Sequence, residues 1–249
     1  MKNIVKMNLY RLFRNIYFII GCVLAAVITF FYTSHGEEIN IQHYVESPTE
    51  YMIFISVGAV VLFSILSAFM VNVENFDGVL RNKIISGHSQ REVYFAHLIT
   101  QFVFELCVIA AWFIGGIAGG AKITSNLLIY IVLMIFFCLA YISVLTAIGM
   151  RIKTQVVAVA LSIGVFYLCF NGMLIGNYIT MISADTPAAL PAGFIYNMDV
   201  IGQWFARSSF GYEIEEVNIG FPLQLLASIT VIVIANVIGN LKLNTREVH

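Results

Sequence analysis

Three polar side chains follow one another at intervals of four residues inside a long apolar run. His97, Gln101 and Glu105 lie within residues 93–121, and a spacing of four places them on one face of a helix. An ionisable group inside a membrane-length apolar segment is costly, so it marks a functional site by default. The stripe could pair with neighbouring helices, line a translocation path, or relay protons through Glu105. Asn171, in a later apolar run, is a weaker candidate for a path or a helix contact.

The composition explains why a glutamate in such a run is unusual. The chain has 249 residues, of which 60% are hydrophobic and 11% are charged, whereas soluble domains carry about 25% charged residues. This excludes an ordinary soluble enzyme, a disordered protein and a nucleic-acid binder. A net charge of −1 gives no electrostatic reason to expect a polyanionic partner. The remaining class is an integral membrane protein.

Six segments are long and apolar enough to cross a bilayer as helices. A spanning helix needs roughly 20 mostly apolar residues, whereas an outer-membrane barrel would show shorter alternating segments. The predicted spans cover residues 16–32, 51–73, 93–121, 126–150, 154–175 and 221–241. We therefore expect an all-α polytopic membrane protein, with residues 1–249 forming a single transmembrane permease-like domain and an uncleaved first span.

The basic residues predict which ends face the cytoplasm. With the N-terminus inside, eleven Lys and Arg residues fall in inside segments and two, Lys122 and Arg207, fall outside, which accounts for all 13. The reverse orientation would invert that ratio. The positive-inside rule therefore places both termini in the cytoplasm, and an even number of spans agrees with this.

Two connecting segments have an amphipathic composition. Residues 1–15 carry an apolar face flanked by basic residues, which suits an interfacial helix before the first span, although a charged leader that only sets orientation is an alternative. Residues 176–220 form a long outside connection that is rich in aromatic and aliphatic residues. We expect short interfacial or re-entrant helices there, because Trp and Tyr favour the membrane interface.

Motifs for catalysis and metal binding are missing. The nearest string to a phosphate-binding loop, GGIAGGAKIT at residues 115–124, lacks the required Gly-Lys pair. Its glycines, at positions 115 and 119 and at 116 and 120, are better explained by close helix packing. Each of the four cysteines lies inside a predicted span, which argues against disulfides and zinc. The chain is therefore predicted to be non-enzymatic, and uphill transport would need energy from a partner chain or an ion gradient.

The inside loop at residues 74–92 keeps apolar residues where lipid does not require them. Val79, Leu80, Ile84 and Ile85 stand among charged and polar residues, which describes a short amphipathic helix. Ser89 is placed to cap the next helix, with Glu92 at the capping-box position. An apolar ridge facing the cytoplasm calls for a protein partner. The alternative is an ordinary positive-inside loop with incidental apolar residues.

This loop also resembles the corresponding loop of type-2 ABC exporter permeases. That family's pattern is an acidic residue, then G-[TV]-[IL]-R-N-K, then G-x-[ST]-R and an aliphatic-Tyr pair. The matching residues here are Glu74, Gly78, Val79, Leu80, Arg81, Asn82, Lys83, Ile84, Gly87, Ser89, Arg91, Val93 and Tyr94. Gln90 separates Ser89 from Arg91, which is a small departure. The opening segment, Asn8 to Asn15, also resembles that of the family.

The resemblance implies a mechanism and partners. Such permeases dimerise, as homodimers or with a related chain, on two copies of a separate ATPase that binds ATP and Mg, and this chain needs no cofactor of its own. The helix at about Gly78–His88 would be the coupling helix seated in the ATPase. The six predicted spans with short loops are similar to those of lantibiotic-immunity and peptide exporters of the bacterial plasma membrane. This similarity implies an amphipathic or antimicrobial peptide as solute. The alternative is an ion-coupled secondary transporter or channel using Glu105 and His97, although no inverted repeat supports it.

Overall fold

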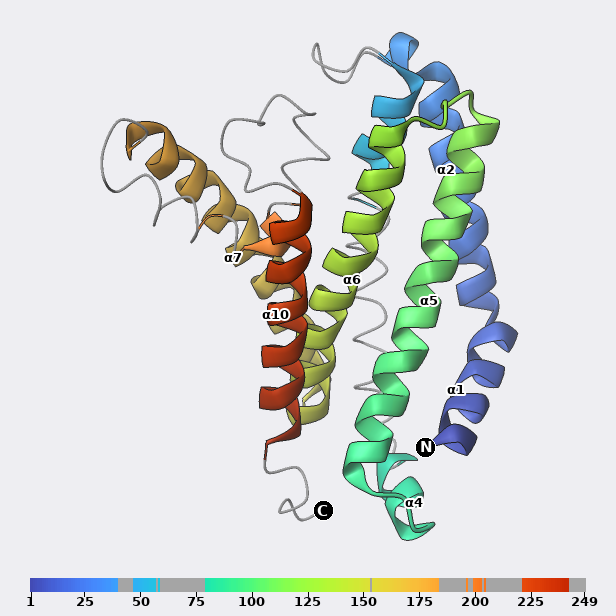
Figure 1. Ribbon diagram of the computed structural model, residues 1–249. Coiled ribbons are helices and arrows are strands. Elements are labelled where there is room, and N and C mark those ends of the chain that lie inside the picture. The colour runs from blue at the N-terminus through green and yellow to red at the C-terminus, as the bar shows by residue number, and fades with distance from the viewer. Residues whose placement is uncertain are drawn as a thin grey trace.

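The computed structural model of the chain is a bundle of long helices (Figure 1). It describes residues 1–39, 47–56, 58, 79–152, 154–183, 196, 199–202, 204 and 221–241. No strand occurs among these residues, which confirms the all-α expectation. The helices in chain order are α1 (Lys2–Arg14), α2 (Ile16–Ile39), α4 (Val79–Ile85), α5 (Gln90–Ala118), α6 (Ser125–Arg151), α7 (Gln155–Ser183) and α10 (Phe221–Asn240). Residues 48–56 are also helical.

Five helices among the described residues are long and apolar enough to cross a membrane. They cover Ile16–Gly36, Gln90–Ala118, Ser125–Arg151, Val156–Gly176 and Phe221–Asn240. Each coincides with one of the predicted spans, so the chain has the architecture of a multi-pass membrane protein. The predicted span at residues 51–73 lies mostly outside the described residues, and the total of six stays a prediction.

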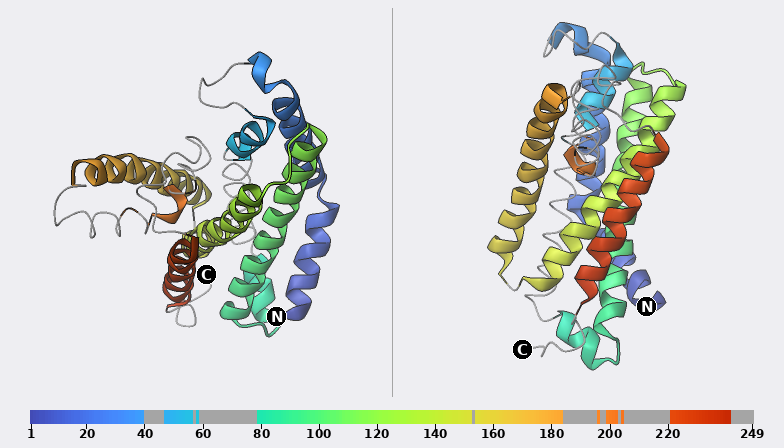
Figure 2. Two further views of the ribbon diagram at one scale, coloured as in Figure 1. Left: turned by 45° about the horizontal axis from the view of Figure 1, so that its top comes forward. Right: turned by 60° about the vertical axis from the view of Figure 1, so that its left-hand side comes forward.

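One end of the bundle gathers the start of α1, the helix α4 and the ends of α6 and α10 (Figure 1). The Arg151 guanidinium, at the end of α6, donates to the carbonyl oxygens of Ile238 and Leu241, the latter at 3.0 Å. A cation beside the last carbonyls of a helix is electrostatically favourable. Arg151 therefore ties the two helix ends together, and α6 and α10 run side by side in the same direction (Figure 2). The start of α1 and the end of α10 thus lie at the same end of the bundle, and the cytoplasmic position of both termini stays a prediction.

Helix α2 packs along α5 through glycines. A Cβ on Gly115 would collide with the backbone oxygen of Ala26, and one on Gly119 would lie 2.7 Å from the Thr33 Cβ and 2.9 Å from the Phe30 oxygen. Glycine therefore permits an approach that any side chain would block. Gly116 similarly accommodates the side chain of Met52.

The fourth glycine of that set has a different role. Gly120 has no neighbour within 4 Å of its Cβ position, and its φ of +104° belongs to the left-handed region that favours glycine. It turns the chain between α5 and α6. The expectation of close packing is therefore supported for three glycines and wrong for Gly120.

Helix α1 packs lengthwise on the first turns of α5. Its buried residues Ile4, Asn8 and Leu12 follow a spacing of four, and Ile4 contacts Val93 and Ala96 of α5. Asn15 has extended backbone angles and separates α1 from α2. The predicted helix at residues 1–15 is confirmed as a helix, and its buried face belongs to the bundle. Phe13 lies off this buried face and is 51% exposed.

Helix α7 is the least enclosed of the five long helices. It diverges from the other helices in two views (Figures 1 and 2), and 17% of its most apolar stretch is buried. Large apolar side chains, including Val156, Tyr167 and Leu168, are exposed along it. In a bilayer these side chains would face lipid or another subunit.

Candidate functional site

The polar stripe of α5 faces the interior of the bundle. His97, Gln101 and Glu105 are 4%, 5% and 0% exposed, so the predicted helix face exists and is buried. Gln101 accepts a hydrogen bond at Oε1 from the Thr146 hydroxyl of α6 at 2.7 Å. Part of the stripe therefore joins two helices, as expected of polar groups in a membrane.

The polar groups continue from α6 onto α10. The amide of Asn236 donates from Nδ2 to the Ser143 hydroxyl at 3.2 Å, and Ser143 lies one helical turn from Thr146. Gln224 and Ser228 of α10 are also buried. The sequence alone did not predict this continuation, because single serine, threonine and asparagine residues in apolar runs give no periodic signal.

Asn171 does not join this group. It lies on α7, and its Nδ2 donates to the Tyr167 carbonyl oxygen one turn earlier, at 2.7 Å. A hydrogen bond within the same helix satisfies this donor locally. The structure therefore unites His97, Gln101 and Glu105 and leaves Asn171 on a separate helix.

The second candidate site is the short helix α4, which lies beyond the ends of α1 and α5 (Figure 1). Ile85 at its end is 73% exposed, and Ile84 is half-buried. Gly87 follows with a φ of +92°, a conformation that glycine adopts without strain. Gly78 lies outside the described residues, as do the side chains of Val79, Leu80 and Arg81. The predicted apolar ridge is thus seen in its second half.

The helix that follows begins as the sequence predicts. The Glu92 backbone N–H donates to the Ser89 hydroxyl at 3.2 Å, and the Ser89 N–H donates to Glu92 Oε2 at 3.3 Å. This reciprocal pair is a capping box, and the prediction is confirmed. Asn82 and Arg91 are exposed nearby. The turn between α4 and α5 is therefore fixed by side-chain as well as backbone hydrogen bonds.

Lys83 departs from the predicted pattern. It was expected among the polar residues surrounding the ridge, yet it is 5% exposed. Its Nζ donates to Oδ1 of Asn8 in α1 at 3.3 Å. Asn8 stands between Ile4 and Leu12 at intervals of four, and that spacing was a signal that its amide would be buried. The contact links α4 to α1.

At the opposite end, Val200, Ile201 and Trp204 reach into the bundle. The Trp204 indole donates from Nε1 to the Tyr130 hydroxyl at 3.0 Å, and this hydroxyl also pairs with the Ser56 hydroxyl at 2.5 Å. Trp204, Val200 and Ile201 are all buried. Residues 200–202 and 204 are helical, and the predicted interfacial or re-entrant helices of residues 176–220 stay a prediction. Their relation to a membrane surface stays a prediction.

Asp199 begins this short helical stretch. Its Oδ1 accepts a hydrogen bond from the Gly202 N–H at 3.1 Å, which is the geometry of a helix cap. Burial raises the pKa of the Asp199 carboxyl above its ordinary value, and the Gly202 hydrogen bond opposes that rise. The hydrogen bond from the Gly202 N–H explains why the Asp199 carboxyl is tolerated beside apolar neighbours.

All four cysteines are free. No group of three or more His, Cys, Asp or Glu residues suited to a metal is found within the described part of the chain. In comparisons with known proteins, no family model and no curated sequence matches this chain.

Proposed function

We propose that the chain is the permease subunit of an ATP-driven exporter, powered by a separate ATPase that docks on α4. The observation that carries the proposal is Ile85, an aliphatic side chain 73% exposed on a short helix beyond the bundle. Lipid covers exposed apolar groups along the spans, whereas a helix beyond their ends needs a protein cover. ATP and Mg belong to that partner, and the permease itself is non-catalytic.

The connections of α4 support a role in transmitting force. Lys83 joins it to α1 through Asn8, and the Ser89–Glu92 capping box fixes its turn into α5. Helix α1 leads into α2, and α2 is packed against α5 through Gly115 and Gly119. A push on α4 would thus reach two spans that pack closely against each other.

The remaining parts of the proposal concern the membrane, the assembly and the solute. The chain would reside in a bacterial plasma membrane, with α4 and both termini in the cytoplasm, and would pair with a second permease copy or a related chain. The solute would be hydrophobic or amphipathic, with a peptide or antimicrobial peptide favoured. These parts rest on the loop pattern at residues 74–94.

A second candidate function is ion-coupled transport through the buried stripe. The observation in its favour is Glu105, which is fully buried inside a candidate span on the same face as His97. A carboxyl group in that position can exchange a proton or bind a cation. The two functions differ in their energy source, so dependence on an ATPase partner separates them.

The decisive experiment is co-purification of the full chain with its ATPase partner, followed by the Ile85→Asp variant. A charged group on the exposed ridge should abolish the association. The matched control is Ile123→Asp at the opposite end of the bundle, where the isoleucine is 62% exposed, and this variant should retain the ATPase.

Leu80→Asp and Ile84→Asp extend the test along the helix. A stable complex that tolerates Ile85→Asp, Ile84→Asp and Leu80→Asp would show that α4 is not the docking site. An isolated chain that transports with no ATPase present would contradict the exporter proposal itself.

A further inference from the structure

The exposed face of α1 carries basic and aromatic side chains in one line. Lys6, Tyr10 and Arg14 follow a spacing of four and are all exposed. At 100° per residue they lie opposite Asn8 and Leu12, which are buried on the bundle side. We call Lys6, Tyr10 and Arg14 the basic stripe of α1.

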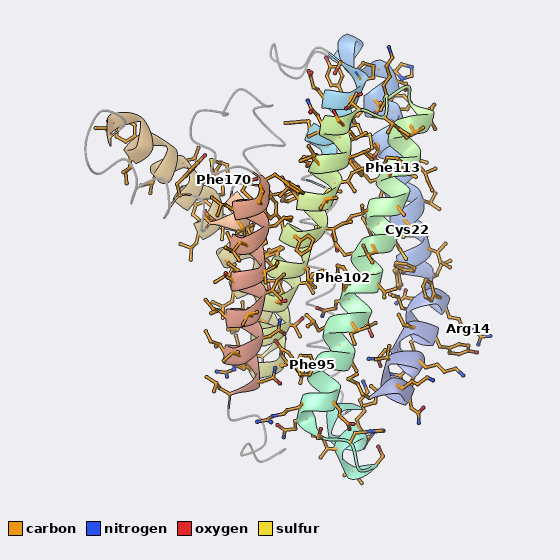
Figure 3. All side chains as sticks on the ribbon, viewed as in Figure 1. Arg14, Cys22, Phe95, Phe102, Phe113 and Phe170 are labelled. Atoms are coloured by element: carbon orange, nitrogen blue, oxygen red, sulfur yellow. The ribbon has the colours of Figure 1, made fainter. Side chains whose placement is uncertain are left out.

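Two members of this stripe are in contact. The Arg14 guanidinium carbon lies 4.5 Å from the centroid of the Tyr10 ring, a cation–π arrangement. Figure 3 shows Arg14 pointing away from α5 at the outer side of α1. The ring therefore orients the guanidinium outward while leaving its donors available.

Exposed aromatic groups border the stripe on the side of the first span. Phe13 is 51% exposed and Tyr17 is 78% exposed, and Tyr17 stands at the beginning of the candidate span Ile16–Gly36. Tyrosine at the end of a span favours the level of the lipid headgroups. Arg14, three residues earlier, therefore stands at headgroup depth.

The charged side chains at the start of the chain are all basic. Residues 1–36 contain Lys2, Lys6, Arg11 and Arg14 and no acidic residue, and all four basic side chains are exposed. Because residues 1–36 contain no acidic side chain, no carboxylate from this segment neutralises the stripe. Arg14 instead pairs with Tyr10. Anionic lipids attract such juxtamembrane basic groups, and guanidinium donors match phosphate oxygens in pairs.

From this geometry we propose that the basic stripe of α1 binds the phosphate headgroup of an anionic phospholipid. Arg14 and Lys6 contact the phosphate, Tyr10 holds Arg14 in place, and Phe13 and Tyr17 contact the upper part of the acyl chains. The buried face of α1 stays packed on α5, so a lipid bound to the outer face would stabilise α1 in this position. This inference is independent of the ATPase partner and of the transported solute.

The test uses the full chain in a neutral detergent, titrated with phosphatidylglycerol or phosphatidylcholine. Native mass spectrometry counts the bound lipids, and thermal unfolding reports the stabilisation. Phosphatidylglycerol should bind more tightly than phosphatidylcholine. Each of Lys6→Gln and Arg14→Gln should weaken phosphatidylglycerol binding by about fivefold, since a basic group near an anionic lipid contributes on the order of 1 kcal/mol.

Two controls distinguish the site from general charge. Lys122→Gln removes one exposed positive charge at the other end of the bundle and should leave phosphatidylglycerol binding unchanged. Tyr10→Phe keeps the ring beneath Arg14 and should also bind as the unaltered chain does, whereas Tyr10→Ala should weaken binding. Glycerol 1-phosphate, a soluble headgroup without acyl chains, should not compete at equal concentration.

Certain results would overturn the proposal. One is a Lys6→Gln, Arg14→Gln double variant that binds phosphatidylglycerol as tightly as the unaltered chain. Another is an equal loss in Lys122→Gln, because it would mean that net charge alone sets lipid binding. Full competition by glycerol 1-phosphate would show a soluble phosphate site in place of a lipid site.

A folding control accompanies these variants. Unchanged thermal unfolding of the variants in phosphatidylcholine would confirm that they remain folded.

Discussion

Lys83 of α4 donates a hydrogen bond from Nζ to Oδ1 of Asn8 in α1, at 3.3 Å, and both side chains are buried. This contact joins residues 75 positions apart in the chain. It connects the helix that we propose as the ATPase dock with the helix that leads into the first span. Its stability therefore bears on whether α4 and α1 move together.

Asn8→Ala should destabilise the chain by about 1–3 kcal/mol, since it removes an acceptor from a buried ammonium group. Asn8→Asp should retain the contact, because a carboxylate accepts from Lys83 and also offsets its charge. The measurement is thermal unfolding of the purified chain in detergent. Asn3→Ala, at an exposed position of the same helix, is the matched control and should have little effect. Equal stability of Asn8→Ala and Asn3→Ala would contradict this account.

Gly115→Ala should disrupt the packing of α2 on α5. The added methyl group would meet the backbone oxygen of Ala26, and backbone cannot rotate aside as a flexible side chain can. The expected loss is about 1–3 kcal/mol, which is typical of overpacking. Thermal unfolding in detergent is the measurement for this variant and its control.

Gly164→Ala in α7 is that control, because its added methyl group meets nothing within 4 Å. It should be neutral or stabilise the chain by up to about 1 kcal/mol, since alanine favours helix over glycine. A loss in Gly164→Ala as large as that in Gly115→Ala would mean that packing against α2 is not the cause.

Tyr130→Phe should loosen the segment around Trp204. The variant removes the acceptor of the Trp204 indole and the partner of the Ser56 hydroxyl, at a cost of about 1–3 kcal/mol. The chain contains two tryptophans, so a Trp112→Phe background isolates the fluorescence of Trp204. Adding Tyr130→Phe to that background should shift the emission to longer wavelength and increase quenching by iodide. Tyr167→Phe, at a position 64% exposed on α7, should change neither property.

Glu105→Gln should preserve ATP-driven transport if the chain is an exporter permease. Glutamine keeps the size and most of the hydrogen-bonding capacity of glutamate, so helix contacts at this buried position can persist. Transport and ATPase association are measured together in reconstituted vesicles. Loss of transport with the complex intact, accompanied by loss of proton dependence, would instead favour the ion-coupled alternative.

The local features of the chain were predictable because they depend on neighbouring residues. Five long helices follow from long, mostly apolar runs, and the Ser89–Glu92 capping box follows from a spacing of three residues. The placement of His97, Gln101 and Glu105 on one face follows from their spacing of four. Each of these predictions needs a single helix and its solvent, without knowledge of any partner helix.

The contacts between helices were decided by the tertiary structure. Nothing in the spacing around Lys83 predicts that its ammonium group would turn inward to Asn8, since the two segments meet through the packing of α1 on α5. The same string of glycines gives close packing at Gly115 and Gly119 and a turn at Gly120, because the helix ends at Ala118 and the next residues follow a different path.

By itself, the sequence determined that this is a helical membrane protein, where its long helices lie and which face of α5 is polar. The tertiary structure decided which polar groups meet, namely Gln101 with Thr146, Tyr130 with Trp204 and Lys83 with Asn8. The physical reason is that hydrophobicity and helix periodicity act along the chain. Hydrogen bonds between spans depend on the rotation and depth at which two helices pack.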